Sequence, residues 1–146
     1  MTMKGSTAAV GSASGSRQSR RVPTVLVVED EVLIRMAVAD YLRDCGYRVV
    51  EAGNGDEAVT LLKTDAEVDV VFSDVNLPGG VNGFTLAQWL RRERPGLRII
   101  LTSGIVKAAR EARDLCEEGP LVEKPYDHRE VERRIRSLLA SRARRD

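Results

Sequence analysis

Five short apolar runs, separated by amphipathic segments, constrain the fold of this chain more than any other feature of its sequence. The runs are VLVV (25–28), YRVVEA (47–52), VDVVFS (68–73), RIILTS (98–103) and LVEK (121–124). Each run is too short for a helix, and β-branched residues are frequent among them, which favours strands. The sequence therefore predicts five strands.

The segments between these runs have the spacing of helices. They are residues 31–45, 56–63, 83–94, 107–117 and 127–142. In the first, apolar residues from Leu33 to Cys45 recur at intervals of three and four, and Gly46 stands where a glycine cap ends a helix. Strands that alternate with helices indicate an α/β fold in which helices cover both faces of a parallel sheet.

Length and composition allow one folded domain. The chain has 146 residues, of which 42% are hydrophobic, enough for a single core. Residues 1–21 are mostly Gly, Ser, Ala and Thr and are expected to be a disordered leader, because they hold too few large apolar side chains to offset the entropy of ordering. We expect the domain at 22–142 and a basic tail at 143–146.

Charge is distributed unevenly along the chain. Residues 22–128 hold 12 Lys or Arg and 19 Asp or Glu, whereas the two ends together hold 11 and 3. An acidic body argues against a nucleic-acid-binding fold, because it would repel phosphates. No run approaches the 18 or so apolar residues that span a bilayer, and no secretory signal is recognisable. We therefore expect a cytoplasmic protein with no membrane partner.

Polar residues stand where the predicted strands end. They are Glu29 and Asp30 after the first strand, Asp74 after the third, Thr102 and Ser103 at the end of the fourth, and Lys124 at the end of the fifth. In doubly wound sheets the ligand crevice lies beyond the carboxyl ends of the strands. These residues are therefore expected to converge on one rim of the sheet.

Three carboxylates on that rim would repel one another. At about 5 Å and an effective dielectric constant near 20, each pair costs about 3 kcal/mol, which protonation or a bound cation relieves. Hard oxygen ligands that are too few for a full protein cage suit Mg²⁺ with several retained waters. Beside such a cation, a lysine and a hydroxyl, Asp74 can attack phosphorus and form an acyl phosphate.

Taken singly, each of these features has a simpler interpretation. An Asp before a Pro-Gly turn usually serves the turn, and the acidic pair before a helix often serves helix capping and the helix dipole. Their joint occurrence at the ends of strands one, three and five favours a functional site.

The motifs resemble those of a known family. VLVVEDE (25–31), SDVNLPGGVNG (73–83), LTSG (101–104) and EKPY (123–126) together resemble the receiver domain of two-component response regulators, over residues 24 to about 140. The resemblance implies a flavodoxin-like (βα)5 three-layer sandwich with a parallel five-stranded sheet of order 2-1-3-4-5.

The resemblance also assigns roles. It implies that Asp74 is the phosphoacceptor, and that Glu29 and Asp30 hold Mg²⁺ together with Asp74 and the backbone carbonyl of Asn76. The family's hydroxyl residue matches Ser103, with Thr102 the less favoured candidate.

Near the C-terminus, Lys124 matches the lysine that contacts the phosphoryl oxygens, and the Lys124–Pro125 bond is cis in the family. Two departures stand out. The loop at 79–83 is one residue longer than the commonest form, and Leu121 replaces an aromatic that many members use to report phosphorylation.

The implied partner is a sensor histidine kinase or a histidine phosphotransfer protein. The chain stops about 20 residues after Lys124, so we expect a stand-alone receiver without a DNA-binding or other output domain. Such a receiver would act through contacts with an unidentified downstream protein or as a phosphorelay. Homodimers through the face of the fourth helix, fifth strand and fifth helix are a weaker expectation.

The sequence argues against two other classes of protein. A hydrolase of the haloacid dehalogenase type also uses an aspartyl nucleophile after a strand, but it needs a second Asp two residues on, where this chain has Asn76. A flavodoxin-like module for a nucleotide or flavin needs a phosphate-binding loop after the first strand. Here that loop is Glu29-Asp30-Glu31, which would repel phosphate.

Overall fold

Five parallel strands form one sheet in the order β2-β1-β3-β4-β5. The computed structural model describes residues 21–103, 122–123 and 126–145. The strands are β1 (Thr24–Val28), β2 (Arg48–Ala52), β3 (Val70–Asp74), β4 (Arg98–Ser103) and β5 (Val122–Glu123). The predicted α/β class and the strand order implied by the resemblance are confirmed.

The helices lie where the sequence predicts them, within the described part of the chain. They are α1 (Val32–Asp44), α2 (Gly55–Leu62), α3 (Gly83–Glu93) and α5 (His128–Arg145). The helix predicted at 107–117 falls outside the described residues, as do Leu121, Lys124 and Pro125.

Local hydrogen bonds explain where two of the helices begin. The side chain of Asn54 accepts a hydrogen bond from the backbone N–H of Glu57 at 2.8 Å, which caps α2. At α3, Asn82 and Thr85 form a reciprocal capping box. After α1 the chain turns at Gly46, whose φ of 102° favours glycine.

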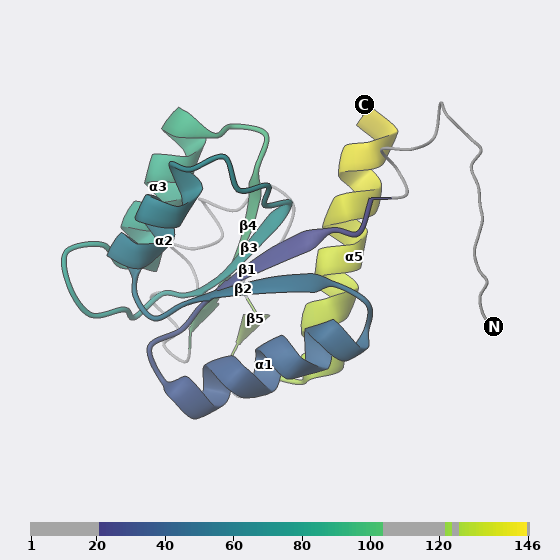
Figure 1. Cartoon of the computed structure of the whole chain (residues 1–146), viewed down its shortest axis with the longest axis horizontal. Helices are drawn as coiled ribbons and strands as arrows, with labels where there is room; N and C mark the ends of the chain where they lie inside the picture. Colours follow the sequence, from purple (N-terminus) through teal and green to yellow (C-terminus); the bar gives the residue numbers. More distant parts are fainter. Residues whose placement is uncertain (1–20, 104–121, 124–125, 146) are drawn as a thin grey trace.

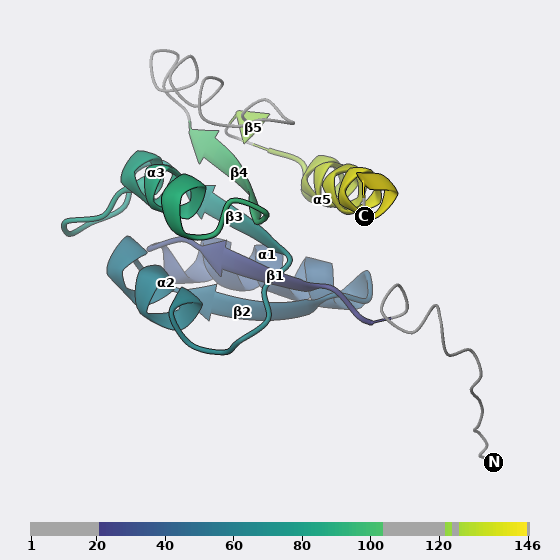
Figure 2. The same cartoon turned by 90° about the horizontal axis from the view of Figure 1, so that it is seen from above.

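Two layers of helices cover the sheet, α1 and α5 on one face and α2 and α3 on the other (Figures 1 and 2). Strand β1 shows why both faces need apolar residues. Val25 and Val27 pack into the cluster that contains the α1 and α5 side chains, whereas Leu26 and Val28 pack into the cluster of α2 and α3. All five residues of β1 are buried, as expected for a central parallel strand.

The first turn of α1 departs from the expected apolar pattern. The spacing of Leu33 matches the apolar face of the helix, yet the residue is 81% exposed. Val32 and Met36 are also large exposed hydrophobic residues, at 52% and 47%. This turn follows directly on the loop after β1, so an apolar surface lies beside the carboxyl end of the central strands.

Candidate functional site

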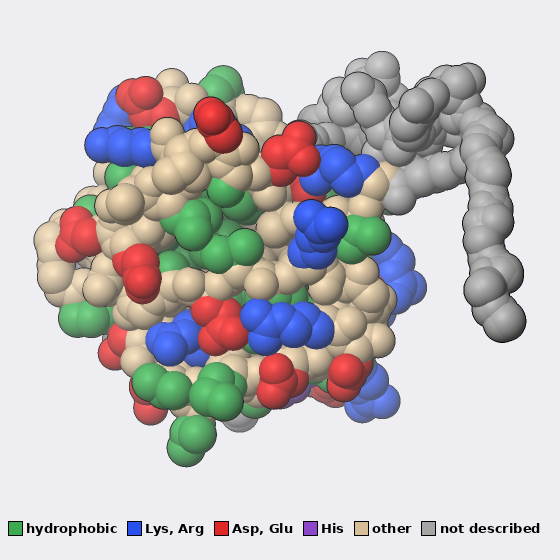
Figure 3. Space-filling view, viewed as in Figure 1, with side chains coloured by type: hydrophobic (Ala, Val, Ile, Leu, Met, Phe, Trp, Pro, Cys, Tyr) green, Lys and Arg blue, Asp and Glu red, His purple; other side chains and the backbone are tan. Residues whose placement is uncertain are grey.

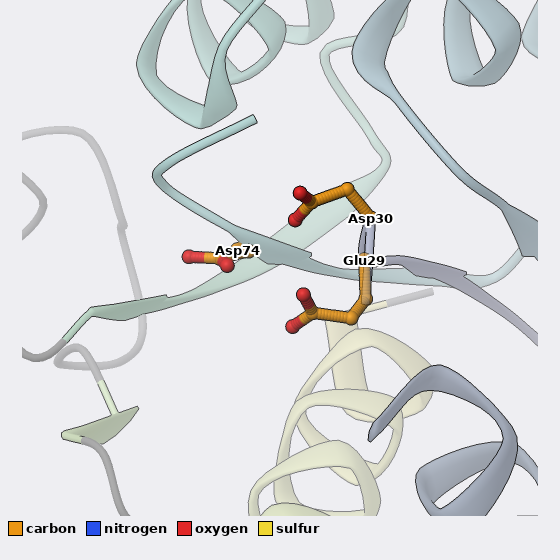
Figure 4. Close-up of side chains that lie close together, drawn as sticks. All are labelled: Glu29, Asp30 and Asp74. Carbon is orange, nitrogen blue, oxygen red and sulfur yellow. The ribbon is translucent and has the colours of Figure 1, made fainter. Parts of the chain in front are cut away.

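Three carboxylates meet at the carboxyl end of the sheet. Glu29 and Asp30 follow β1, and Asp74 ends β3, the strand that pairs with β1. One carboxylate oxygen from each of the three lies within 4.8 Å of the others, and Figure 4 shows the three side chains gathered at this edge. Glu29 and Asp74 are buried, at 3% and 4% exposure, whereas Asp30 is exposed to solvent.

Backbone hydrogen bonds fix the position of Asp74. The N–H of Asn76 donates to Asp74 Oδ1 at 3.1 Å, and the N–H of Val75 donates to the carbonyl of Thr102 on β4 at 2.9 Å. The N–H of Gly83, at the start of α3, donates to the carbonyl of Val75 at 2.9 Å. The loop between β3 and α3 therefore closes back on the residue that follows Asp74.

Glu29 is held at its backbone and at its side chain. Its N–H donates to the carbonyl of Ala52 at 3.0 Å, and its Oε2 accepts a hydrogen bond from the N–H of Glu31 at 3.1 Å. The carbonyl of Glu29 accepts a hydrogen bond from Arg35 Nη1 at 2.8 Å. The turn that carries two of the three carboxylates is thus anchored to β2 and to α1.

The two hydroxyl candidates both lie at the end of β4, and both are 1% exposed. Thr102 is the register partner of Asp74, and Ser103 is the next residue. Thr102 Oγ1 is buried and has no hydrogen-bond partner in the described part of the structure. An uncompensated buried hydroxyl costs about 1–3 kcal/mol.

Of the two remaining predicted site residues, Lys124 and Asn76, the structure describes only Asn76. Lys124 lies outside the described residues. Asn76 stands two residues after Asp74 in the loop beyond β3, where it is exposed. The structure thus brings Glu29, Asp30 and Asp74 together and leaves the lysine undescribed.

Tyr126 is a neighbour of the site that the predicted set of site residues lacks. Burial raises the pKa of its hydroxyl far above the usual range, and the negative charges of Glu29, Asp74 and Glu31 raise it further. Its ring contacts Phe72 edge-on, with centroids 5.5 Å apart and planes at 87°. The signal available in the sequence was the position of Tyr126, directly after the Lys-Pro pair of the EKPY motif.

The donor set fits a hard divalent cation. Three carboxylates within 4.8 Å offer oxygen ligands only, and their mutual repulsion is relieved when a cation binds between them. Three protein carboxylates leave several positions of an octahedral Mg²⁺ for water or for substrate oxygens. The residues present therefore suit Mg²⁺ better than a cation that needs a protein cage.

None of the described helices is long and apolar enough to cross a membrane.

Comparisons with known proteins agree with this geometry. The family model of the response regulator receiver domain matches residues 25–136. Over 119 residues the chain is 35% identical to the sensor kinase CckA of Brucella abortus, a match that covers 80% of this chain and 12% of that protein. The chain spans about half or less of the length of the curated relatives it matches.

Solved structures share the fold. The CheY-like response regulator receiver domain protein from Methanospirillum hungatei superposes with a TM-score of 0.78 at 20% identity, covering 86% of this chain and 100% of that chain. The response regulator protein TrrA from Thermotoga maritima, solved in complex with Mg²⁺ and BeF, gives a TM-score of 0.69 at 25% identity, covering 80% and 99%. The resemblance seen in the sequence motifs is confirmed, and this chain belongs to the response regulator receiver domain family.

Proposed function

We propose that this domain accepts a phosphoryl group from a phosphohistidine of a sensor kinase, or of a histidine phosphotransfer protein, onto Asp74. The observation that carries the proposal is the cluster of Glu29, Asp30 and Asp74 at the carboxyl end of the sheet, with ligand oxygens within 4.8 Å. The relationship to a sensor kinase supports the choice of donor. The proposal includes a cytoplasmic location and signalling through contacts with other proteins or as a phosphorelay.

In the proposed reaction, a carboxylate oxygen of Asp74 attacks phosphorus. The bond between phosphorus and the imidazole nitrogen breaks, and the imidazole leaves with its electron pair and takes up a proton from solvent. Mg²⁺ bound to the acidic cluster would neutralise charge on the transferring group. Glu29, Asp30 and Asp74 would hold the cation, with the backbone carbonyl of Asn76 as a further ligand.

The other site residues act on the phosphoryl oxygens. Lys124 would contact one oxygen through its ammonium group, and the hydroxyl of Ser103 would donate a hydrogen bond to another. Attack of water on phosphorus would break its bond to the Asp74 oxygen, release inorganic phosphate and return Asp74 to its carboxylate form, which would limit the lifetime of the signal.

The test is the intact mass of the protein after incubation with acetyl phosphate and Mg²⁺. We expect a gain of about 80 Da, one phosphoryl group on a carboxylate, that EDTA prevents and that peptide mapping locates at Asp74. A gain on another residue, or one that is unaffected by EDTA, contradicts the proposed site.

Replacing Thr102 with Val separates the two hydroxyl candidates. Because Thr102 Oγ1 is buried without a partner in the described structure, Thr102→Val should raise the free energy of unfolding by about 1 kcal/mol in urea denaturation. The labelling rate with acetyl phosphate should not change. Ser103→Ala is the matched control and should slow labelling; the opposite pattern would transfer the hydroxyl role to Thr102.

The exposed apolar turn of α1 supports docking of a protein donor. Val32, Leu33 and Met36 lie directly after the acidic loop, and hydrophobic side chains protrude at the lower edge of the surface in Figure 3, where α1 lies. Exposed apolar groups beside a reaction centre favour a protein partner over a small donor alone.

Leu33→Gln tests this docking surface without adding charge. A phosphorylated kinase that labels the wild type should transfer its phosphoryl group to this variant about tenfold more slowly, the effect of losing an apolar contact at the centre of an interface that is worth about 1.4 kcal/mol. Labelling by acetyl phosphate should be unchanged. Val22→Gln, at an exposed apolar residue that precedes β1, is the control, and equal transfer by both variants would contradict docking at α1.

A further inference from the structure

Arg35 connects the acidic turn to the helix beside it. Its Nη1 donates to the carbonyl of Glu29 at 2.8 Å, while its Nε donates to Glu51 Oε1 at 3.2 Å. The side chain is 19% exposed, so most of it is shielded from solvent. We infer that Arg35 is a positioning residue for the metal site, an inference that rests on the proposed function.

The contact with Glu29 acts on the backbone and not on the carboxylate. The N–H of Glu29 is already bonded to Ala52 of β2, and its carboxylate accepts a hydrogen bond from Glu31. With the carbonyl also held by Arg35, the peptide unit between Glu29 and Asp30 has a fixed orientation. Both metal-ligating side chains leave the backbone beside this peptide unit, so their directions depend on it.

The fork of the guanidinium group is suited to this task. Two of its nitrogens reach two acceptors at once, a backbone carbonyl and a carboxylate, which one ammonium nitrogen cannot reproduce at the same spacing. Glu51 is itself fixed, because its Oε2 accepts a hydrogen bond from Arg43 Nη2 at 3.1 Å. Arg43 lies farther along α1 and has no contact with Glu29 among its described hydrogen bonds.

Gly53 provides the space that the guanidinium group occupies. A Cβ atom at this position would lie 3.3 Å from Arg35 Nη1, closer than the usual van der Waals contact. The φ of Gly53 is not in the left-handed region, so alanine is compatible with the backbone and changes mainly this contact. Gly53→Ala therefore displaces Arg35 without altering its side chain.

The experiment measures binding of Mn²⁺, as a paramagnetic probe, and its competition by Mg²⁺. Arg35→Lys keeps the charge and should raise the Kd for both cations about tenfold, the lower end of the effect of losing a residue that orients metal ligands. Gly53→Ala should also raise the Kd for both cations. Arg43→Lys changes an arginine that is bound to the same Glu51. Its Kd for the two cations should stay within about twofold of the wild-type value.

The variants distinguish failure of the role inferred for Arg35 from failure of the proposed metal site. If Arg35→Lys lowers the melting temperature without metal but leaves the Kd unchanged, the role of Arg35 is structural only and the inference is overturned. An equal rise in Kd for Arg43→Lys also overturns it, because the effect would then come from the Glu51 network. Asp30→Asn must weaken binding strongly; if it binds like the wild type, the proposed metal site fails and this inference fails with it.

Discussion

Asp74→Asn is expected to be more stable than the wild type in the absence of divalent cations, although it can no longer be phosphorylated. The substitution removes one of three negative charges whose ligand oxygens lie within 4.8 Å of one another. Each pair costs about 3 kcal/mol at an effective dielectric constant of 20, a figure that exposure of Asp30 lowers. The side-chain oxygen of Asn can still accept the hydrogen bond that Asn76 donates to Asp74 Oδ1.

We expect a net gain of about 1–2 kcal/mol in the free energy of unfolding, and a rise of several degrees in the melting temperature. Both are measured in EDTA by urea and thermal denaturation. Addition of Mg²⁺ should stabilise the wild type more than the variant, because the cation binds the intact cluster in the folded state. The difference between the two proteins should therefore shrink or reverse.

Asp65→Asn serves as the control for the loss of a carboxylate. Asp65 is exposed in the segment between α2 and β3, so its removal should change stability by less than about 0.5 kcal/mol. An unchanged or lower melting temperature for Asp74→Asn would mean that the three carboxylates do not repel one another in solution. Stoichiometric, persistent labelling of that variant would falsify the assignment of Asp74 as phosphoacceptor.

The strands were predictable because each depends on a local pattern, whereas their order was implied by the family resemblance. A central parallel strand buries both faces, so the unbroken run from Val25 to Val28 predicts a strand between two layers of helices. The carboxyl ends of parallel strands meet at one edge of the sheet, which brings residues far apart in the chain together. Glu29 and Asp74 could therefore be placed near each other from their positions after two such runs.

The contacts that position the site were not predictable in the same way. The hydrogen bond from Arg35 to Glu29 depends on how α1 lies against the loop after β1. Its second partner, Glu51, belongs to β2, whose register pairs it with Val27 of β1. Neither spacing nor composition specifies these side-chain directions, since an arginine on a helix is more often found in a solvated position.

Gly83→Ala should destabilise the domain and slow phosphorylation, although alanine is the better helix former. Gly83 is the first residue of α3 and is buried against the end of β3. A Cβ atom there would lie 2.5 Å from the carbonyl oxygen of Asp74 and 2.6 Å from Cα of Val75. Both atoms belong to the backbone, so the clash is relieved only if α3 or the loop after Asp74 moves.

That movement has two measurable consequences. It weakens the hydrogen bond from the N–H of Gly83 to the carbonyl of Val75, and with the steric cost it should lower the free energy of unfolding by about 3 kcal/mol in urea denaturation. It also shifts the backbone of Asp74 against Glu29 and Asp30, so labelling by acetyl phosphate should slow by about tenfold or more, since small displacements of reacting groups are costly.

Gly80→Ala, in the same loop, separates steric contact from chain flexibility. A Cβ atom on Gly80 meets nothing within 4 Å, and its φ is not in the left-handed region. This substitution should leave labelling unchanged and alter stability by at most about 1 kcal/mol, in the stabilising direction. If both variants had the same labelling rate and the same stability, the close approach of α3 to the end of β3 would not position Asp74. The loop at 79–83 would then only connect β3 to α3. A large loss confined to Gly83→Ala would instead mean that close packing of α3 helps to align the carboxylate.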